Sequence, residues 1–168
     1  IRLRLLERRD VPIDGGWWRE RLTECRDRRL GLDASAWRAV HAEGDGLPAL
    51  IVDRYDRWLV VQLLSAGLET QRAMIVEALR EVFQPEGILF RHDVPTRRLE
   101  GLDDRVELAM GTVPEQVEVR EGSVRWYAAP WTGQKTGAFL DQRENRQLAG
   151  ALVPEGGTAL DCETGKRV

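Results

Sequence analysis

The sequence predicts an α+β fold with a central strand–hairpin–helix domain, then a β meander, then a last helix and strand. Three observations lead to this class. Strand-like segments separated by turn residues fill 37–64, and an apolar stripe at helical spacing follows at 66–83. Three more strand-like segments fall between 105 and 128. A helix signal covers 141–152, and a short strand ending in an acid follows it.

Size and composition set limits on the class of protein. The 168 residues can bury one or two modest cores, and 42% hydrophobic with 32% charged residues is typical of a soluble globular protein. No apolar run approaches the roughly 20 residues that span a bilayer, and no secretory signal pattern is present. Cys25 and Cys162 lie far apart without a metal-ligand pattern. We therefore expect a cytoplasmic protein with reduced thiols, no bound metal and no membrane partner.

Charge gives a mixed indication about nucleic acid. The net charge of −3 carries no overall basic signature. The basic residues are almost all arginine, with lysine only at 135 and 166. Arginine binds phosphate through two parallel hydrogen bonds and stacks on bases, so local RNA contact is compatible with this composition, as is a bias of a GC-rich genome.

The first element expected is a strand over residues 1–9, where apolar side chains alternate with arginine. A turn-rich connector at 10–16 follows, so residues 1–14 are expected to be the end of a truncated domain plus a linker. Asp14 is placed to cap a helix from about Gly16 to Leu32. One stripe of that helix carries Trp18, Leu22, Cys25 and Arg29. Its other face mixes arginines with acids, which fits a salt-bridged solvent face or an RNA contact.

The central domain is expected to occupy 15–104. Its first strands are 37–42, 49–54 and 58–64, and Gly44-Asp45-Gly46 is expected to form the first hairpin turn. Asp45 is interpreted as a turn former rather than a catalytic acid, and His41 as a sheet residue with a satisfied ring.

Ser65 is expected to cap a helix that runs to about Phe83 and ends before Pro85. Its apolar stripe, which includes Leu68, Ile75 and Leu79, is interpreted as core. A short buried strand at 87–91 comes next.

A loop is expected from His92 to Asp104, broken by Pro95 and Gly101. Arg97 and Arg98 in this loop allow two interpretations. They contact RNA phosphate, or they pair with the nearby acids. The acids are Glu100, Asp103 and Asp104.

The last region, 105–168, starts with the three-stranded meander. Val117 and Val119 alternate opposite Val124 and Trp126, as hairpin partners do. A twelve-residue block, Lys135-Thr-Gly-Ala-Phe-Leu-Asp-Gln-Arg-Glu-Asn-Arg146, then leads into the helix of 141–152.

Within the block, Asp141 and Glu144 form an Asp-x-x-Glu capping box. A helix N-terminus with nearby arginine suits an anionic or carboxylate ligand, although an ordinary capped surface helix has the same pattern.

The twelve-residue block, with Ala159-Leu-Asp-Cys162 after it, resembles the S-adenosylmethionine-dependent methyltransferases that make 5-methylcytosine in large-subunit (23S) ribosomal RNA. Two further matches occur in the same order and at similar spacing. One is Val40-His-Ala-Glu-Gly-Asp-Gly-Leu-Pro48 with the Leu50–Tyr55 run, and the other is Arg97-Arg-Leu-Glu-Gly-Leu102. Together the three matches cover residues from about 37 to 162.

The resemblance implies a domain order. A PUA-like RNA-binding domain would end near residue 14, and 105–168 would hold the meander and the first helix and strand of a class I methyltransferase domain. The glycine-rich turn that such a domain requires does not follow Cys162. We therefore expect the chain to be a fragment. Methylation at C5 needs a cysteine thiolate, and neither cysteine matches that position, so no catalytic residue is assigned and the fragment is expected to be inactive.

The same resemblance implies site residues. Lys135, Thr136 and Phe139 would line or cover the S-adenosylmethionine site, and Asp161 would lie at the sheet edge beneath the cofactor. The residues that would reach the methionine carboxylate or the bound base are Gln142, Arg143 and Asn145. The predicted function is methyl transfer to ribosomal RNA in rRNA processing. The alternative is a non-catalytic RNA-binding module that keeps the central domain, and the oligomeric state is not predicted.

Overall fold

The structure is a computed structural model that describes residues 3–154, 156–158, 160–161 and 166–167. Compact units are formed by Ile1–Ala138 and Phe139–Val168, which are described separately below. Strands and helices are both present, and the expected α+β class is confirmed.

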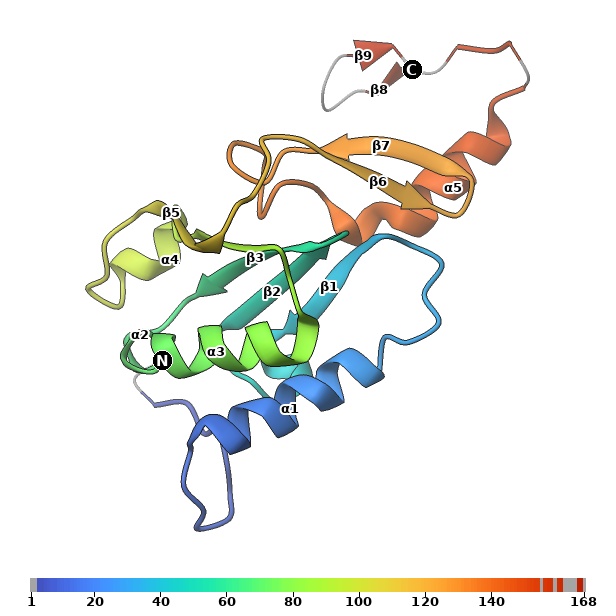
Figure 1. The fold of residues 1–168 in the computed structure, drawn as a ribbon. Helices are drawn as coiled ribbons and strands as arrows, with labels where there is room; N and C mark the ends of the chain where they lie inside the picture. The colour runs from blue at the N-terminus through green and yellow to red at the C-terminus, as the bar shows by residue number, and fades with distance from the viewer. Residues whose placement is uncertain (1–2, 155, 159, 162–165, 168) are drawn as a thin grey trace. The chain divides into compact units, whose positions relative to one another are not determined.

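A five-stranded sheet in the order β1-β2-β3-β4-β5 organises the first unit (Figure 1). β3 and β4 are parallel, while the other neighbours are antiparallel. The parallel pair is joined by helices that cross over the sheet, as this pairing requires. The strand bounds are β1 Ala36–His41, β2 Leu50–Tyr55, β3 Trp58–Leu63, β4 Gly87–Arg91 and β5 Val106–Gly111.

Two long helices, α1 (Gly15–Asp27) and α3 (Arg72–Phe83), lie side by side on one face of this sheet (Figure 1). Asp14 caps α1 by accepting the Trp17 N–H at 3.0 Å, as expected. α1 ends at Asp27, five residues earlier than the sequence pattern indicated, because residues 28–31 form a turn.

The expected helix of 66–83 is divided in two. Ser65 caps α2 (Ala66–Thr70), and α3 begins after a turn residue, Gln71. The Gln71 side chain accepts a 2.7 Å hydrogen bond from the buried indole of Trp18. α3 ends at Phe83 with Gln84 in the left-handed conformation, one residue before Pro85.

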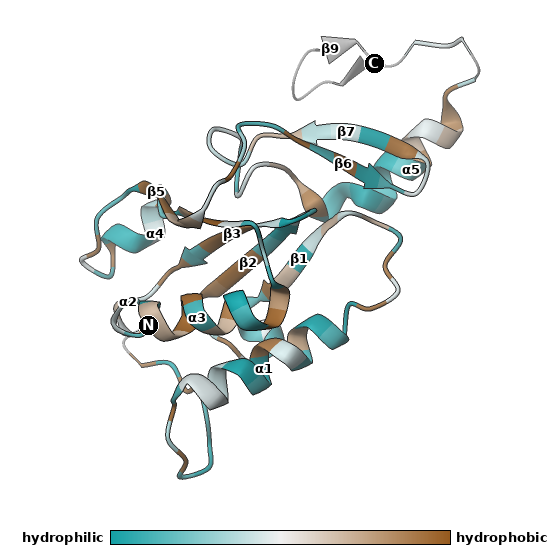
Figure 2. Ribbon diagram, viewed as in Figure 1, coloured by the Kyte–Doolittle hydropathy of each residue, from teal (hydrophilic) through white to brown (hydrophobic). Residues whose placement is uncertain are grey.

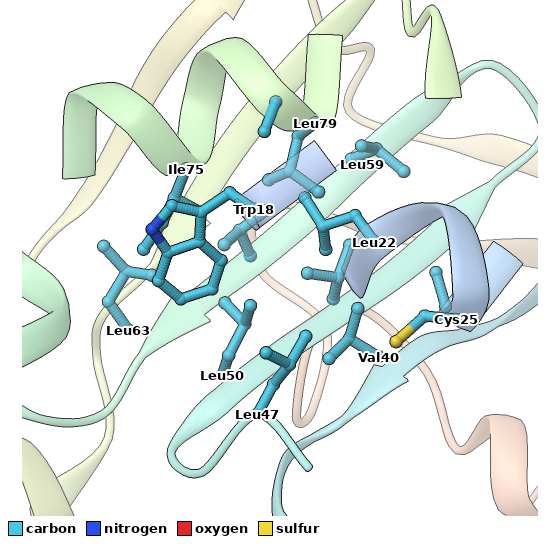
Figure 3. Close-up of a cluster of buried hydrophobic side chains, with 14 of the residues drawn as sticks. Trp18, Leu22, Cys25, Val40, Leu47, Leu50, Leu59, Leu63, Ile75 and Leu79 are labelled. Carbon is cyan, nitrogen blue, oxygen red and sulfur yellow. The ribbon is translucent and has the colours of Figure 1, made fainter. Parts of the chain in front are cut away.

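Apolar side chains between the helices and the sheet make the main core (Figure 3). Figure 2 shows the apolar runs of β2 and β3 in brown. We call this side of the sheet the helix-covered face. The labelled members of the cluster are Trp18, Leu22, Cys25, Val40, Leu47, Leu50, Leu59, Leu63, Ile75 and Leu79.

The link between β1 and β2 is longer than the expected hairpin turn. It contains a 3₁₀ turn, η1 (Ala42–Asp45), and Gly46 in the left-handed conformation. The Asp45 carboxylate accepts the His41 N–H at 2.7 Å and pairs with Arg29 at 2.5 Å. Asp45 is therefore a structural residue, as expected. His41 contacts Arg38 through its ring nitrogen at 3.4 Å.

The polar side of α1 is salt-bridged. Arg21 pairs with Glu24, and Arg26 pairs with Asp27. Arg19 reaches across to Glu81 on α3. These pairs match the salt-bridged solvent face that was one of the two interpretations of the sequence.

Two expectations about strands are wrong. Among residues 3–9 no strand forms, and this segment pairs with none of the strands of the central sheet. β5 does not join a meander but pairs antiparallel with β4. Since β5 completes the central sheet, the expected boundary between 104 and 105 falls inside the first unit, whose last residue is Ala138.

A separate hairpin follows, made of β6 (Val117–Glu121) and β7 (Val124–Ala128). Val119 pairs with Trp126, which confirms the expected register. An isolated β-bridge between Ala34 and Glu121 and an ion pair between Arg120 and Asp33 connect the hairpin to the segment before β1. The chain then enters a loop at 129–138, which we call the clamp loop.

The second unit starts with a 3₁₀ turn, η2 (Leu140–Gln142), followed by α5 (Arg143–Leu152). The expected capping box is not formed, because the helix begins two residues later than Asp141 and Gln142 occupies the N-cap without a side-chain hydrogen bond. β8 (Leu160–Asp161) pairs antiparallel with β9 (Lys166–Arg167). The expected strand of 158–161 is therefore shorter, and Ala159 and Cys162 lie outside the described residues.

Candidate functional site

The clamp loop folds tightly on itself. The Gly133 N–H donates to the Ala129 carbonyl at 2.7 Å, and the Gly137 N–H donates to Gln134 at 2.9 Å. A Cβ at position 133 would lie 2.4 Å from the Gly137 carbonyl oxygen. Gly137 has a φ of +132°, a conformation that other residues rarely adopt. Both glycines are thus required by the path of the backbone.

Asp53 binds the clamp loop from the sheet. It sits on β2 next to Val52, so its side chain points away from the helix-covered face. The Thr136 hydroxyl donates to the Asp53 Oδ2 at 2.5 Å. The Tyr55 hydroxyl lies 3.1 Å from the Thr136 oxygen. We call this second side of the sheet the clamp face.

Arg38 supplies the positive charge that Asp53 needs. It stands directly opposite Asp53 in the β1–β2 pairing, and its Nε and Nη2 donate at 2.9 and 3.0 Å to the two carboxylate oxygens. Asp53 is fully buried while Arg38 keeps one side open to solvent. A buried carboxylate is stable when it is paired and hydrogen-bonded, and both conditions are met here. Burial, with the nearby Asp53 charge, raises the pKa of Tyr55, which stays a neutral hydroxyl.

Arg91, at the end of β4, is a second attachment point for the clamp loop. It is 5% exposed, and its guanidinium donates to the Pro130 carbonyl at 2.7 Å and to the Gly133 carbonyl at 3.0 Å. The same group makes two 2.9 Å bonds to Asp93, which hold the pKa of that carboxyl below its usual value. The Trp131 indole donates to the Val113 carbonyl at 2.9 Å. The loop is therefore fixed at several points.

The predicted cofactor residues fall in both units. Lys135 and Thr136 belong to the clamp loop, and Lys135 is exposed at a positive φ of 56°. Thr136 is 1% exposed and its hydroxyl is already bonded to Asp53 and Tyr55. That Thr136 lines or covers a ligand site stays a prediction. Its side chain attaches the loop to the sheet.

The other predicted cofactor residues lie at the start of the second unit. Gln142 and Asn145 are exposed, and the Asn145 amide donates to the Gln142 oxygen at 2.6 Å. Arg143 pairs with Glu144 at 2.6 Å and lowers the pKa of that carboxyl. Phe139 is half-buried, and the side chain of Asp161 lies outside the described residues. The structure thus brings Gln142, Arg143 and Asn145 together within one helical turn.

The two predicted RNA contacts differ sharply in exposure. Residues 95–98 form a short helix, α4 (Pro95–Arg98), where a loop was expected. Arg97 is 1% exposed, pairs with Glu69 at 3.2 Å and donates to the Leu63 carbonyl. Its burial argues against contact with RNA phosphate. Arg98 is exposed and bonded to Asp104, one of the acids expected to pair with it.

Three residues of this site were not singled out from the sequence: Asp53, Arg91 and Arg38. A signal was available for the first, because Asp53 interrupts the apolar run of 50–52 in a strand that is otherwise buried. Arg91 ends a buried strand in the same way. A charged side chain within a buried strand must find a partner, and here that partner is the clamp loop or the neighbouring strand.

The described residues contain no group of three or more histidine, cysteine or acidic side chains placed to hold a metal ion. In the same part of the chain, no helix is long and apolar enough to cross a membrane. Cys25 is fully buried, and burial raises the pKa of its thiol to about 11. A thiol in that state is a core side chain and not a nucleophile.

Comparison with known proteins finds similar sequences whose names agree with one another. "Ribosomal RNA large subunit methyltransferase I" of Aeromonas hydrophila is 40% identical over 160 residues, covering 92% of this chain and 40% of that protein. The protein of the same name from Vibrio cholerae is 38% identical over 149 residues, covering 86% of this chain. The chain spans about two fifths of the length of these curated relatives. No protein-family model matches the chain.

Solved structures resemble the fold. A putative SAM-dependent methyltransferase from Streptococcus mutans superposes with a TM-score of 0.71 at 21% identity, covering 86% of this chain and 38% of that one. A second structure, titled as a putative methyltransferase complexed with SAH, gives a TM-score of 0.70 at 21% identity and covers 84% of this chain. At that identity the likeness shows a shared fold.

Proposed function

We propose that this chain is part of a methyltransferase that transfers the methyl group of S-adenosylmethionine to C5 of a cytosine in large-subunit ribosomal RNA. The observation that carries the proposal is the 40% identity, over 92% of the chain, to a protein named as a large-subunit rRNA methyltransferase. Cytosine C5 as the target, a PUA domain before the central domain, and a cytoplasmic location rest on the resemblance of the sequence motifs.

The start of α5 supports cofactor binding. S-adenosylmethionine supplies an activated methyl group and carries a carboxylate and hydroxyls. The Arg143 guanidinium can donate two parallel hydrogen bonds to the cofactor carboxylate when that carboxylate replaces Glu144 as its ion-pair partner. Gln142 and Asn145 offer exposed amides from the same turn. These groups fit the polar end of the cofactor, whereas Thr136 does not contribute its hydroxyl.

The described residues hold no nucleophile for the reaction. Methylation at C5 is expected to need a thiolate that adds to C6 of cytosine, and the raised pKa of the buried Cys25 excludes that thiol. Cys162 lies outside the described residues. The proposal therefore assigns the described residues to cofactor and RNA binding, and no catalytic residue is named.

RNA contact is proposed for Arg98 and not for Arg97. Arg98 is exposed on α4 and its partner Asp104 is exchangeable for phosphate. The neighbouring Arg97 is buried and serves as an internal control. Substitution Arg98→Gln should weaken RNA binding and reduce its dependence on salt concentration.

The test uses the full-length product of the gene that encodes these residues. It is incubated with methyl-labelled S-adenosylmethionine and with large-subunit rRNA that lacks modifications, and the label is mapped. The account predicts label as 5-methylcytosine. Arg143→Ala should raise the KM for the cofactor about tenfold, the loss expected for one charge-assisted contact. Arg80→Gln, an exposed arginine on α3, is the matched control and should leave the KM unchanged.

A wild-type protein that binds rRNA but neither binds the cofactor nor transfers label would overturn the proposal. That outcome would favour an RNA-binding module without catalysis. Label at another base or another carbon of cytosine would keep the methyltransferase and replace its target.

A further inference from the structure

The clamp loop ends at Ala138, and the chain continues directly into Phe139 and the predicted cofactor residues of 142–145. The loop also carries Lys135. Whatever fixes the loop on the sheet therefore fixes the backbone that carries Lys135. The residues that fix it come from strands far away in the sequence.

Asp53 is the centre of this attachment. It is fully buried and accepts three hydrogen bonds, two from Arg38 and one from Thr136. A neutral apolar contact would hold the loop against the sheet without setting its position along the strands. A charged carboxylate with bonds of 2.5–3.0 Å sets both position and direction, because these bonds weaken steeply with angle and distance.

Arg91 acts on the other side of the same loop. Its guanidinium donates hydrogen bonds to two backbone carbonyls, those of Pro130 and Gly133, and it also donates to the Asp93 carboxylate. Thr136 and these two carbonyls are spread over most of the clamp loop. Two separate anchors on β2 and β4 prevent the loop from pivoting about either one.

We infer that Asp53 and Arg91 are positioning residues for the clamp loop and its predicted cofactor residue Lys135, acting through the Thr136 hydroxyl and the clamp-loop carbonyls. The inference rests on the proposed function and adds residues that it does not contain. Neither side chain needs to touch the cofactor. Their effect is to keep the clamp loop in one conformation before the ligand binds, which lowers the entropic cost of binding.

Two conservative substitutions at position 136 separate the effect of the hydroxyl from the effect of side-chain size. Thr136→Val keeps the side-chain size and removes the hydroxyl, whereas Thr136→Ser keeps the hydroxyl. In the full-length gene product, Thr136→Val should raise the Kd and KM for S-adenosylmethionine about tenfold, with a smaller change in kcat. Thr136→Ser should stay within about twofold of wild type. Arg91→Lys, which keeps the charge but loses the fork, should resemble Thr136→Val.

Ile75→Val is the control for a general loss of stability, because it removes a methyl group from the core on the helix-covered face. It lowers stability but should leave the KM for the cofactor unchanged. Hydrogen exchange of the Gly133 and Gly137 amides gives a readout without cofactor. Thr136→Val should speed both, and Ile75→Val should not.

The outcomes distinguish the two proposals. If wild type binds the cofactor and both Thr136→Val and Arg91→Lys bind it equally well, the positioning role is wrong and the proposed function stands. If wild type binds no cofactor and transfers no methyl group, the proposed function is wrong and the positioning role falls with it.

Discussion

The two faces of the central sheet are closed by different kinds of interaction. The helix-covered face is sealed by apolar side chains from α1 and α3, with Trp18, Leu22 and Leu79 fully buried. The clamp face is closed around a carboxylate, Asp53, and a guanidinium, Arg91. Apolar packing is strong but tolerates small shifts, whereas charged hydrogen bonds demand a defined geometry. The helix-covered face thus contributes most of the stability, and the clamp face sets the position of the clamp loop.

The largest expected effect lies on the helix-covered face. Trp18→Ala should lower the free energy of unfolding by about 3–5 kcal/mol, because it leaves a cavity and strands the Gln71 amide that the indole bonds. Leu99→Ala is the control, since Leu99 is 87% exposed and its loss should cost less than about 0.5 kcal/mol. Denaturant unfolding of the chain measures both. Equal midpoints for the two variants would refute the assignment of the core.

On the clamp face the expected effect is smaller. Asp53→Asn keeps the shape but removes the charge that pairs Arg38, and should cost about 2 kcal/mol. Asp56→Asn makes the same chemical change three residues further along the chain, at an exposed acid just after β2. It should leave the unfolding midpoint unchanged, and a cost equal to that of Asp53→Asn would mean that the clamp adds nothing specific.

The free energy of unfolding should depend on pH because of His92, which directly follows β4. His92 is fully buried, accepts the Leu63 N–H at 3.2 Å, and has a pKa lowered to about 3 by burial and by Arg97 and Arg105. The unfolded chain binds a proton there below about pH 6.5 while the folded protein does not. Stability should therefore fall as the pH drops below 6.5, by about 1 kcal/mol per pH unit, until the pH nears the folded pKa.

The check is the pH dependence of unfolding in His92→Gln. The variant lacks the titrating ring, so its stability should fall less steeply between pH 6.5 and pH 4 than that of wild type. Identical slopes in the two proteins would show that His92 titrates normally in the fold.

The smallest effect is expected at the surface. Arg80→Gln breaks the Glu77 pair on α3, whose partners are both about half exposed. Solvent and salt screen such pairs, so the unfolding midpoint should not move measurably at physiological ionic strength. A clear loss of stability would mean that this ion pair stabilises the fold more than its exposure to solvent indicates.

The contrast between the faces also explains what the sequence could predict. The apolar spacing of 66–83 and the alternation of 117–126 are local signals, and they led to α3 and the β6–β7 hairpin. The pairing of β5 with β4 is set by tertiary structure and no local pattern encodes it, so the strand-like pattern of 105–111 does not reveal its partner. Asp141 matches a capping pattern, but it lies within the 3₁₀ turn η2, so α5 begins later than the pattern predicts.

The candidate site shows the same limit. The block of 135–146 was identified from its motif, but the motif does not say which side chains face a ligand and which face the protein. Thr136 faces the protein because its hydroxyl bonds to Asp53. Asp53 lies more than eighty residues earlier in the chain, so the local sequence does not show this contact. Arg97 and Arg98 are adjacent in sequence and differ almost completely in exposure. Burial, which decides both cases, is a property of the folded sheet.

The measurement that tests the clamp most directly is a double-mutant cycle between Asp53→Ala and Thr136→Val, read by denaturant unfolding. A direct charge-assisted bond predicts a coupling free energy of at least about 1 kcal/mol. The control cycle, Thr136→Val with Ile75→Val on the helix-covered face, should be additive within about 0.5 kcal/mol. Additivity in the Asp53–Thr136 cycle as well would contradict the account, because it would mean that the clamp loop is not held by this pair.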